Sequence, residues 1–161
     1  MKVSEVPRQA SEPVIDAFIS ASRALVAVAV RSLADVAEEV TLTQYRTLVV
    51  LASRGPQRLT ELAQAVGVTP ATATRMCDRL LAKGLIVRRT ERGDRRNVRI
   101  SLSDAGRTLV AVVTSNRRRE IEQIVGGITA ADRDVFVKVL ERFTLAAGEV
   151  PEQDWASGWA I

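Results

Sequence analysis

Residues 59–84 read LTELAQAVGVTPATATRMCDRLLAKG, and this stretch decides the fold. Apolar side chains recur every three to four positions on both sides of Gly67, the pattern of two amphipathic helices joined by a tight turn. Thr69 followed by Pro70 predicts the start of the second helix, because threonine caps helix N-termini and proline fits the first helical turn. The stretch therefore predicts a helix-turn-helix.

The second of these helices has two different sides. We expect its buried stripe to consist of Ala73, Met76, Cys77 and Leu80. The opposite side carries small residues and arginines, which suit entry into a DNA major groove about 12 Å wide. The residues expected to contact DNA from this helix are Thr69, Pro70, Ala71, Thr72, Thr74, Arg75 and Arg79. A solvent-facing helix of an ordinary α-helical bundle would explain the stripe but not the arginines.

A β-hairpin is predicted after this helix. Residues 85–87 and 98–102 have strand-like patterns, and the polar residues 90–97 between them favour a turn. An arginine at a narrow loop tip suits the minor groove, where the negative potential is strong. The residues expected to contact DNA from this wing are Arg92, Asp94, Arg95 and Arg96. Asp94 lies two residues before Arg96, so its carboxylate is placed to hold the guanidinium extended.

Positive charge is concentrated in this region. Residues 75–99 contain nine basic and three acidic residues, a net charge of +6, whereas the whole chain has +4. The rest of the chain is therefore slightly acidic. A solvated basic face is one interpretation, and a polyanion partner is the other. Eight of the nine basic residues are arginines, whose planar fork suits phosphates and guanine edges.

The flanking sequence predicts further helices, and the fold class is mainly α with a small β-hairpin (α+β). A long amphipathic helix is expected from Val14 to about Val40, and part of its stripe is expected to face a second subunit. Thr41 and Gln44 form a capping-box pattern. Thr60 is expected to cap the short helix before Gly67 and to contact DNA from the N-terminus of that helix. Ser103 and Thr129 are expected to cap two closing helices. The expected regions are a flexible lead-in (1–12), a dimerisation helix (13–40), a winged helix-turn-helix lobe (41–103), C-terminal dimerisation helices (104–147) and a tail (148–161).

Composition excludes several functions. The chain has no histidine and only one cysteine, Cys77, so His-dependent triads, His-ligated metal sites and intramolecular disulfides are excluded. Six aromatic residues are too few for a base-stacking platform. No carboxylate pair or glycine-rich phosphate loop stands out, so we expect no enzyme, no cofactor and no metal. The longest uncharged run, residues 62–74, is shorter than the roughly 20 residues of a membrane span, and we expect a cytoplasmic protein.

The sequence resembles the MarR family of bacterial winged-helix regulators over about residues 12–145. The motifs that carry the resemblance are Leu59–Ala63, Thr69–Arg75, Asp78–Leu80, Gly84–Ile86 and Asp94–Arg96 with Ile100–Ser103. The resemblance implies a homodimer joined by the first, fifth and sixth helices that binds a near-palindromic duplex, usually as a repressor. It also implies release by small aromatic or phenolic anions bound between the dimer arm and the DNA-binding lobe.

The resemblance also assigns roles to particular residues. Dimer contacts are expected from Val14, Phe18, Ile121, Ile124, Val135, Val139 and Phe143. The resemblance does not assign the effector residues. Arg23, Arg31 and Arg46 are each candidates to anchor an effector carboxylate, of which Arg23 and Arg46 are preferred, and the alternative is that they are ordinary surface charges of amphipathic helices. Peroxide-sensing relatives use a cysteine near the first helix, which this chain lacks, so Cys77 is expected to be a core thiol rather than a redox switch.

We therefore expect a sequence-specific transcriptional regulator that binds DNA as a homodimer. One alternative is an architectural protein that coats DNA without specificity. Another is a winged-helix module that docks on the acidic surface of a partner protein. The tail carries Trp155 and Trp159, which would share one face if it were helical and would otherwise belong to a disordered tail.

Overall fold

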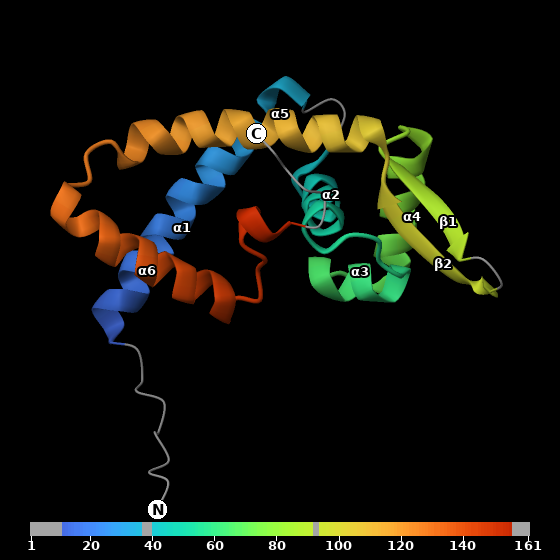
Figure 1. The fold of residues 1–161 in the computed structure, drawn as a ribbon, viewed down its shortest axis with the longest axis horizontal. Helices are drawn as coiled ribbons and strands as arrows, with labels where there is room; N and C mark the ends of the chain where they lie inside the picture. The colour runs from blue at the N-terminus through green and yellow to red at the C-terminus, as the bar shows by residue number, and fades with distance from the viewer. Residues whose placement is uncertain (1–10, 37–39, 92–93, 156–161) are drawn as a thin grey trace, which may run out of the picture.

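The computed structural model describes residues 11–36, 40–91 and 94–155, which form six α-helices and one two-stranded antiparallel sheet (Figure 1). The elements are α1 (Glu12–Ser32), α2 (Leu42–Arg54), α3 (Leu59–Val66), α4 (Pro70–Ala82), β1 (Ile86–Glu91), β2 (Asp94–Leu102), α5 (Asp104–Val125) and α6 (Ala130–Ala146), with short 3-10 turns η1 (Ala34–Val36) and η2 (Glu152–Asp154). The predicted fold class is confirmed. The lead-in expected at 1–12 lies mostly outside the described residues, and α1 already begins at Glu12.

Side-chain caps fix most of the helix starts. The hydroxyl of Thr41 accepts from the Gln44 amide and the Gln44 side chain accepts from the Thr41 amide, so the predicted capping box is confirmed. The predicted caps Ser103 and Thr129 are confirmed as well. The cap predicted at Thr60 is wrong. The N-cap of α3 is Arg58, two residues earlier, and the carboxylate of Glu61 accepts from its amide at 2.8 Å.

The first helix is shorter than its apolar pattern predicts. It ends at Ser32 rather than near Val40, and η1 follows. Leu33 is buried and Val36 packs on the core. The apolar spacing of three to four continues through the 3-10 turn, because the chain changes direction while the same side chains still face the core.

The core lies where α2 crosses the other elements of the lobe. Leu48 of α2, Leu62 of α3 and Leu80 of α4 are fully buried, and so are side chains from both strands and α5. At Gly106 the first turn of α5 lies against the carbonyl of Leu85, and an added Cβ would stand 2.0 Å from that oxygen. This close approach fixes α5 against the end of α4.

The hairpin is longer and its loop shorter than predicted. The strands pair from Ile86 with Leu102 to Glu91 with Asp94, so most of the expected loop 90–97 belongs to the strands. On the lobe side, the backbone of Gln57 exchanges two hydrogen bonds with Ile100, at 2.9 and 2.8 Å. The loop between α2 and α3 thereby anchors the base of the wing.

The helices α1 and α6 form the other end of the molecule, and α5 runs from the wing along the lobe to reach them (Figure 1). The ion pair from Arg31 to Glu120, at 2.7 Å, joins α1 to α5. Of the described helices, α1 alone is long and apolar enough to cross a membrane by length and composition, although core helices of soluble proteins meet the same criterion. The sequence reasoning missed this, because it counted uncharged runs and α1 is interrupted by Asp16 and Arg23.

Candidate nucleic-acid interface and ligand cavity

The turn between α3 and α4 has the geometry that the sequence predicts. Gly67 adopts φ +77° and ψ +35°, a left-handed conformation that glycine reaches without strain. Its amide and that of Val68 both donate to the carbonyl of Ala63 at 3.0 Å, which closes the C-terminus of α3. The glycine therefore sets the angle at which α4 leaves α3.

The stripe predicted to bury α4 is confirmed. Ala73, Cys77 and Leu80 are fully buried, and Met76 is buried with 7% of its surface exposed. The hydroxyl of Thr47 in α2 also donates to the Met76 sulfur at 3.2 Å. This packing fixes the rotation of α4 and so determines which of its residues face outward.

The outward side of α4 begins at its N-terminus. Thr69 caps the helix by accepting from the amide of Thr72 at 3.2 Å, and the Thr74 hydroxyl donates to the carbonyl of Pro70 at 2.9 Å. Ala71 is exposed. The helix start therefore presents short side chains and one small exposed residue, which leaves room for a close partner.

Two arginines follow on the same side. Arg75 and Arg79 are exposed, and neither forms an ion pair within the described part of the chain. Between them, Asp78 accepts from Arg88 of β1 at 2.7 Å. The positive charges of Arg75 and Arg79 are therefore free to meet a polyanion, whereas that of Arg88 is partly neutralised.

The wing residues are only partly described. Asp94, Arg95 and Arg96 lie in β2, near the tip of the hairpin, but their side chains are outside the described part of the structure. Arg92 is outside the described residues altogether. The predicted pairing of Asp94 with Arg96 therefore stays a prediction. Thr60 is exposed in the first turn of α3.

Cys77 has the surroundings of a core thiol. It is fully buried on the inner side of α4. Burial raises the pKa of the Cys77 thiol, with Asp78 adding to the effect and Arg88 opposing it. A raised pKa keeps the thiol protonated and unreactive at neutral pH, as expected for a structural cysteine.

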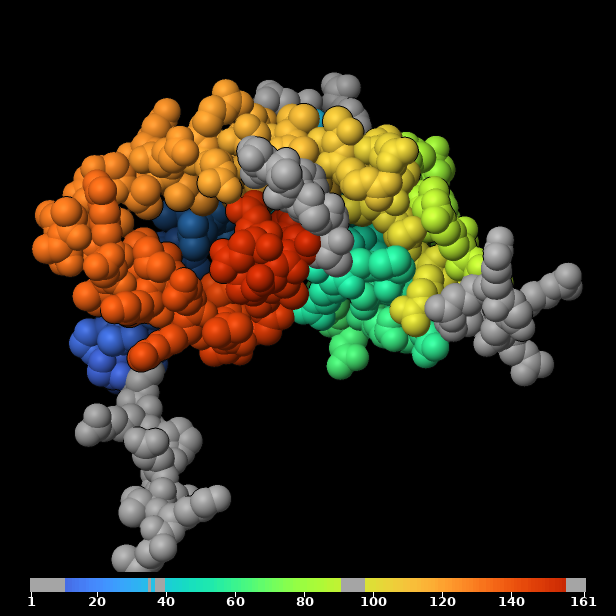
Figure 2. All heavy atoms as spheres, viewed as in Figure 1, coloured from blue at the N-terminus to red at the C-terminus, as the bar shows by residue number. Residues whose placement is uncertain are grey.

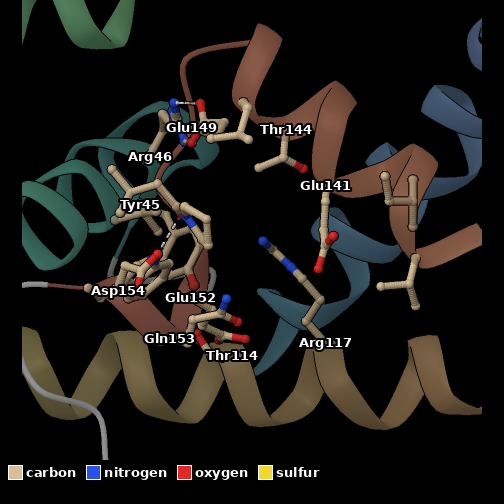
Figure 3. A pocket seen from close by; sticks show the side chains of 17 residues that line it. Tyr45, Arg46, Thr114, Arg117, Glu141, Thr144, Glu149, Glu152, Gln153 and Asp154 are labelled. Carbon is tan, nitrogen blue, oxygen red and sulfur yellow. Dashed lines mark hydrogen bonds and ion pairs between the residues drawn. The ribbon is translucent and has the colours of Figure 1, made fainter. Parts of the chain in front are cut away.

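A cavity of about 700 Å³ opens between the two ends of the molecule (Figure 3). The surrounding elements are α2, α5, α6 and the segment after α6. Apolar walls come from Val49, Val137, Leu140, Leu145, Val150, Pro151 and Trp155. Its polar residues include Tyr45, the cationic Arg46 and Arg117, and the carboxylates Glu141, Glu149, Glu152 and Asp154. The cavity therefore combines apolar walls with two positive charges, in a lining whose formal net charge is negative.

Arg117 points into this cavity (Figure 3). Its guanidinium carbon lies 5.5 Å from the centre of the Tyr45 ring. Its Nε is buried and has no hydrogen-bond partner among the described residues. Burial raises the pKa of the Tyr45 phenol, while the hydrogen bond with Thr114 and the charge of Arg117 oppose the shift. The cavity therefore contains an arginine with an unused donor beside a protonated phenol.

The three effector candidates lie in different places. Arg46 lines the cavity, where it binds the Glu149 carboxylate with both terminal nitrogens, Nη1 at 2.9 Å. Arg23 is exposed on α1, where it donates to Ser20, and Arg31 pairs with Glu120. Arg23 and Arg31 are not lining residues of the cavity. Sequence reasoning missed Arg117, because nothing in the run Arg117–Arg119 indicates which arginine turns inward.

Apolar side chains are exposed on α1 and α6. The described part of α6 has no buried residue, and Val135, Val139 and Phe143 are all more than 40% exposed. Phe143 stacks on Phe18 of α1 with 4.6 Å between ring centroids. Of the other residues expected at a dimer interface, Val14 and Ile124 are exposed and Ile121 is half-buried. These two helices therefore leave apolar surface uncovered within one chain.

A helix-turn-helix followed by a two-stranded hairpin is a winged helix-turn-helix. Similarity to known proteins assigns this one to a family. The sequence profile of the MarR family matches residues 40–98. The chain is 30% identical over 104 residues to the HTH-type transcriptional repressor NicR of Pseudomonas putida, which is 65% of this chain and 66% of NicR. The chain belongs to the MarR family, whose members are transcriptional regulators and not enzymes.

Solved structures agree with this assignment. The crystal structure of RV1404 from Mycobacterium tuberculosis is 42% identical with a TM-score of 0.80, covering 89% of this chain and 99% of that one. BpsR of Bordetella bronchiseptica, whose DNA binding is regulated by 6-hydroxynicotinic acid, is 26% identical with a TM-score of 0.62, covering 83% and 99%. The family membership and fold predicted from the sequence are confirmed.

Proposed function

We propose that this regulator binds a pseudo-palindromic DNA duplex in the bacterial cytoplasm as a homodimer and represses transcription. The observation that carries the proposal is the outward side of α4. Its buried stripe fixes the helix orientation, and Arg75 and Arg79 project from the opposite side without ion pairs in the described residues. Arginines on such a helix suit guanine edges and phosphates in the major groove.

The remaining DNA contacts are proposed from the same lobe. Thr60 and the exposed start of α4 would meet the phosphate backbone, since free amides at helix N-termini favour anions. The wing residues Arg92, Asp94, Arg95 and Arg96 would follow the minor groove. Residues 75–99 carry a net charge of +6, which supports a polyanion as the partner.

Dimerisation is proposed through α1, α5 and α6. Large exposed apolar patches on a monomer mark interaction sites, and α1 and α6 leave such side chains exposed over most of their length. A second copy of this chain would cover both helices at once. A two-fold dimer would place its two α4 helices about 34–36 Å apart, one turn of B-form DNA.

A small aromatic or phenolic acid is proposed as the effector, bound in the cavity near Arg46 and Arg117. The unused Nε of Arg117 and the apolar walls support an anion with a ring. The ligand-regulated DNA binding of the relative BpsR supports the same conclusion, and the repressor activity named for NicR supports repression as the mode of regulation.

Selection of bound sequences from a random duplex pool at physiological salt tests the proposal. Enrichment of an inverted repeat, bound by a dimer in sedimentation, is the expected result. Equal binding of all duplexes would instead show an architectural protein, and no binding to any duplex would show a protein-interaction module. Repeating the selection with aromatic acids tests the effector, which should lower the yield of bound DNA.

A further inference from the structure

The chain after α6 turns back into the ligand cavity. Residues 148–155, called the C-terminal strap below, lie between α6, α5 and α2 (Figure 2). Seven of its eight residues, 149–155, line the cavity. Trp155 also packs against the core of the lobe, and its indole NH donates to the Val150 carbonyl at 3.1 Å. The strap therefore forms one wall of the cavity.

Three arginines hold the strap from two helices. In α2, Arg54 donates to the carbonyl of Gly148 at 2.8 Å, and Arg46 binds the carboxylate of Glu149 with two nitrogens. Arg46 and Arg54 are eight residues apart, about two helical turns, so they lie on the same side of α2. In α5, Arg118 binds the Glu152 carboxylate at 3.3 Å.

The pairing of Arg46 with Glu149 has the form of a ligand contact. A guanidinium that meets a carboxylate with two parallel hydrogen bonds is the usual arrangement for binding a small organic acid. The carboxylate here belongs to the protein itself. Both side chains remain more than a third exposed, 35% for Arg46 and 40% for Glu149, so water reaches the pair and the contact can be exchanged.

We propose that the C-terminal strap is an internal competitor for the cavity: Glu149 occupies the carboxylate position at Arg46, and a free apolar carboxylate binds by displacing it. This inference rests on the proposed effector cavity. The apolar walls define the ligand as a monocarboxylate with a ring or branched hydrocarbon body. The Nε of Arg117 is buried and has no partner in the part of the chain that the structure describes, so it offers that ligand a further donor that Glu149 does not use.

Displacement of Glu149 would couple ligand binding to α4, the helix proposed to contact DNA. The strap links the end of α6, at the proposed dimer interface, to α2, whose buried side packs against α4 through Thr47 and Met76. Releasing Glu149 removes the charged contact between these two parts. The lobe and the dimer arm would then be free to change their separation.

The two tryptophans of the chain are Trp155 and Trp159, so fluorescence reports on this region alone. The parent protein for these measurements is the full chain with Trp159→Phe, in which Trp155 is the single tryptophan. The probe is cyclohexanecarboxylate, which does not absorb near the excitation wavelength, and its uncharged amide is the ligand control. Affinity is measured by calorimetry without DNA, so the result does not depend on DNA binding.

Glu149→Gln tests the competition, and Glu120→Gln is the matched control because it breaks the Arg31 ion pair outside the cavity. Glu149→Gln should bind the carboxylate about fivefold more tightly, the upper range for losing an exposed ion pair. Glu120→Gln should match the parent. Binding of the carboxylate, but not the amide, should shift Trp155 emission of the parent to longer wavelength.

Each contrary result has a defined meaning. Equal affinities of Glu149→Gln and Glu120→Gln, or carboxylate binding with unchanged Trp155 emission in the parent, would overturn the strap proposal and leave the effector cavity standing. If the carboxylate binds neither the parent nor Glu149→Gln nor Glu120→Gln, both the strap proposal and the proposed effector cavity are overturned. Neither result would bear on the proposed DNA interface.

Discussion

Arg88 of the wing donates a hydrogen bond to the carboxylate of Asp78 in α4 across 2.7 Å. The pair joins β1 to the outward side of the helix proposed to read DNA. Their side chains are 40% and 56% exposed, so solvent screens the attraction and its contribution to folding is small. The larger effect is on charge, because Asp78 is an acidic residue between Arg75 and Arg79.

Replacing Asp78→Asn should strengthen DNA binding without much effect on folding. The free energy of unfolding should change by less than about 1 kcal/mol, since the pair is exposed. Freeing Arg88 for one more phosphate in each of the two subunits should steepen the slope of log K against log salt concentration by about 1.8, about 0.9 per phosphate. Fluorescence anisotropy at several salt concentrations measures this slope. Glu120→Gln, which breaks a distant ion pair, should leave it unchanged, and an unchanged slope in Asp78→Asn would contradict the prediction.

Replacing Arg75→Ala should weaken DNA binding and relax the preference for one base position by about 1–3 kcal/mol. The side chain is exposed and has no ion pair in the described structure, so the melting temperature should stay close to that of the parent. Arg23→Ala is the control, because Arg23 is an exposed arginine on α1, far from α4 in the fold. Competition with operator variants altered at single positions makes the comparison. Unaltered affinity and site preference would remove Arg75 from the interface.

Replacing Gly106→Ala should destabilise the fold. The new Cβ would lie 2.0 Å from the carbonyl oxygen of Leu85 and 3.2 Å from a methyl group of Leu102, so backbone has to move. Overpacking of this kind costs about 1–3 kcal/mol, and more where backbone is the obstacle. Gly127→Ala is the matched control, because no atom of the described residues lies within 4 Å of its Cβ position. Urea unfolding of both variants tests the prediction, and equal midpoints would refute it.

The winged helix-turn-helix lobe could be predicted from the sequence because the patterns that define its turns and helix starts are local. The Thr41 capping box, the Gly67 turn and the Thr69–Pro70 helix start each depend on residues within four positions of one another. The buried stripe of α4 follows from helical periodicity alone. The cap predicted at Thr60 was wrong because the side chain of Glu61, in the first turn of α3, accepts from the amide of Arg58, so that the threonine hydroxyl is not needed as a cap.

The cavity could not be predicted in the same way. Arg46 and Glu149 are 103 residues apart, and their contact depends on where the end of α6 directs the strap. Arg117 lies among neighbouring arginines, and only packing against Tyr45 determines that it turns inward. The end of α1 was predicted wrongly for a related reason, because Leu33 and Val36 keep a helical spacing while the chain changes direction.

Cys77 should make the stability of the fold depend on pH in the alkaline range. Burial raises the pKa of its thiol in the folded state, so the unfolded chain loses the proton first. The stabilisation is complete below the unfolded value of about 8.5 and is lost as pH rises from there through the folded pKa. Cys77→Ala should flatten the fall in the free energy of unfolding as pH rises above about 8.5, while losing some stability at all pH values. The raised pKa of Tyr45 affects the free energy of unfolding only near pH 10 and above. Native protein should correspondingly resist iodoacetamide at pH 8 and react once unfolded in urea. Rapid alkylation of the native chain, or equal pH profiles for both proteins, would show that the thiol is accessible and not held by burial.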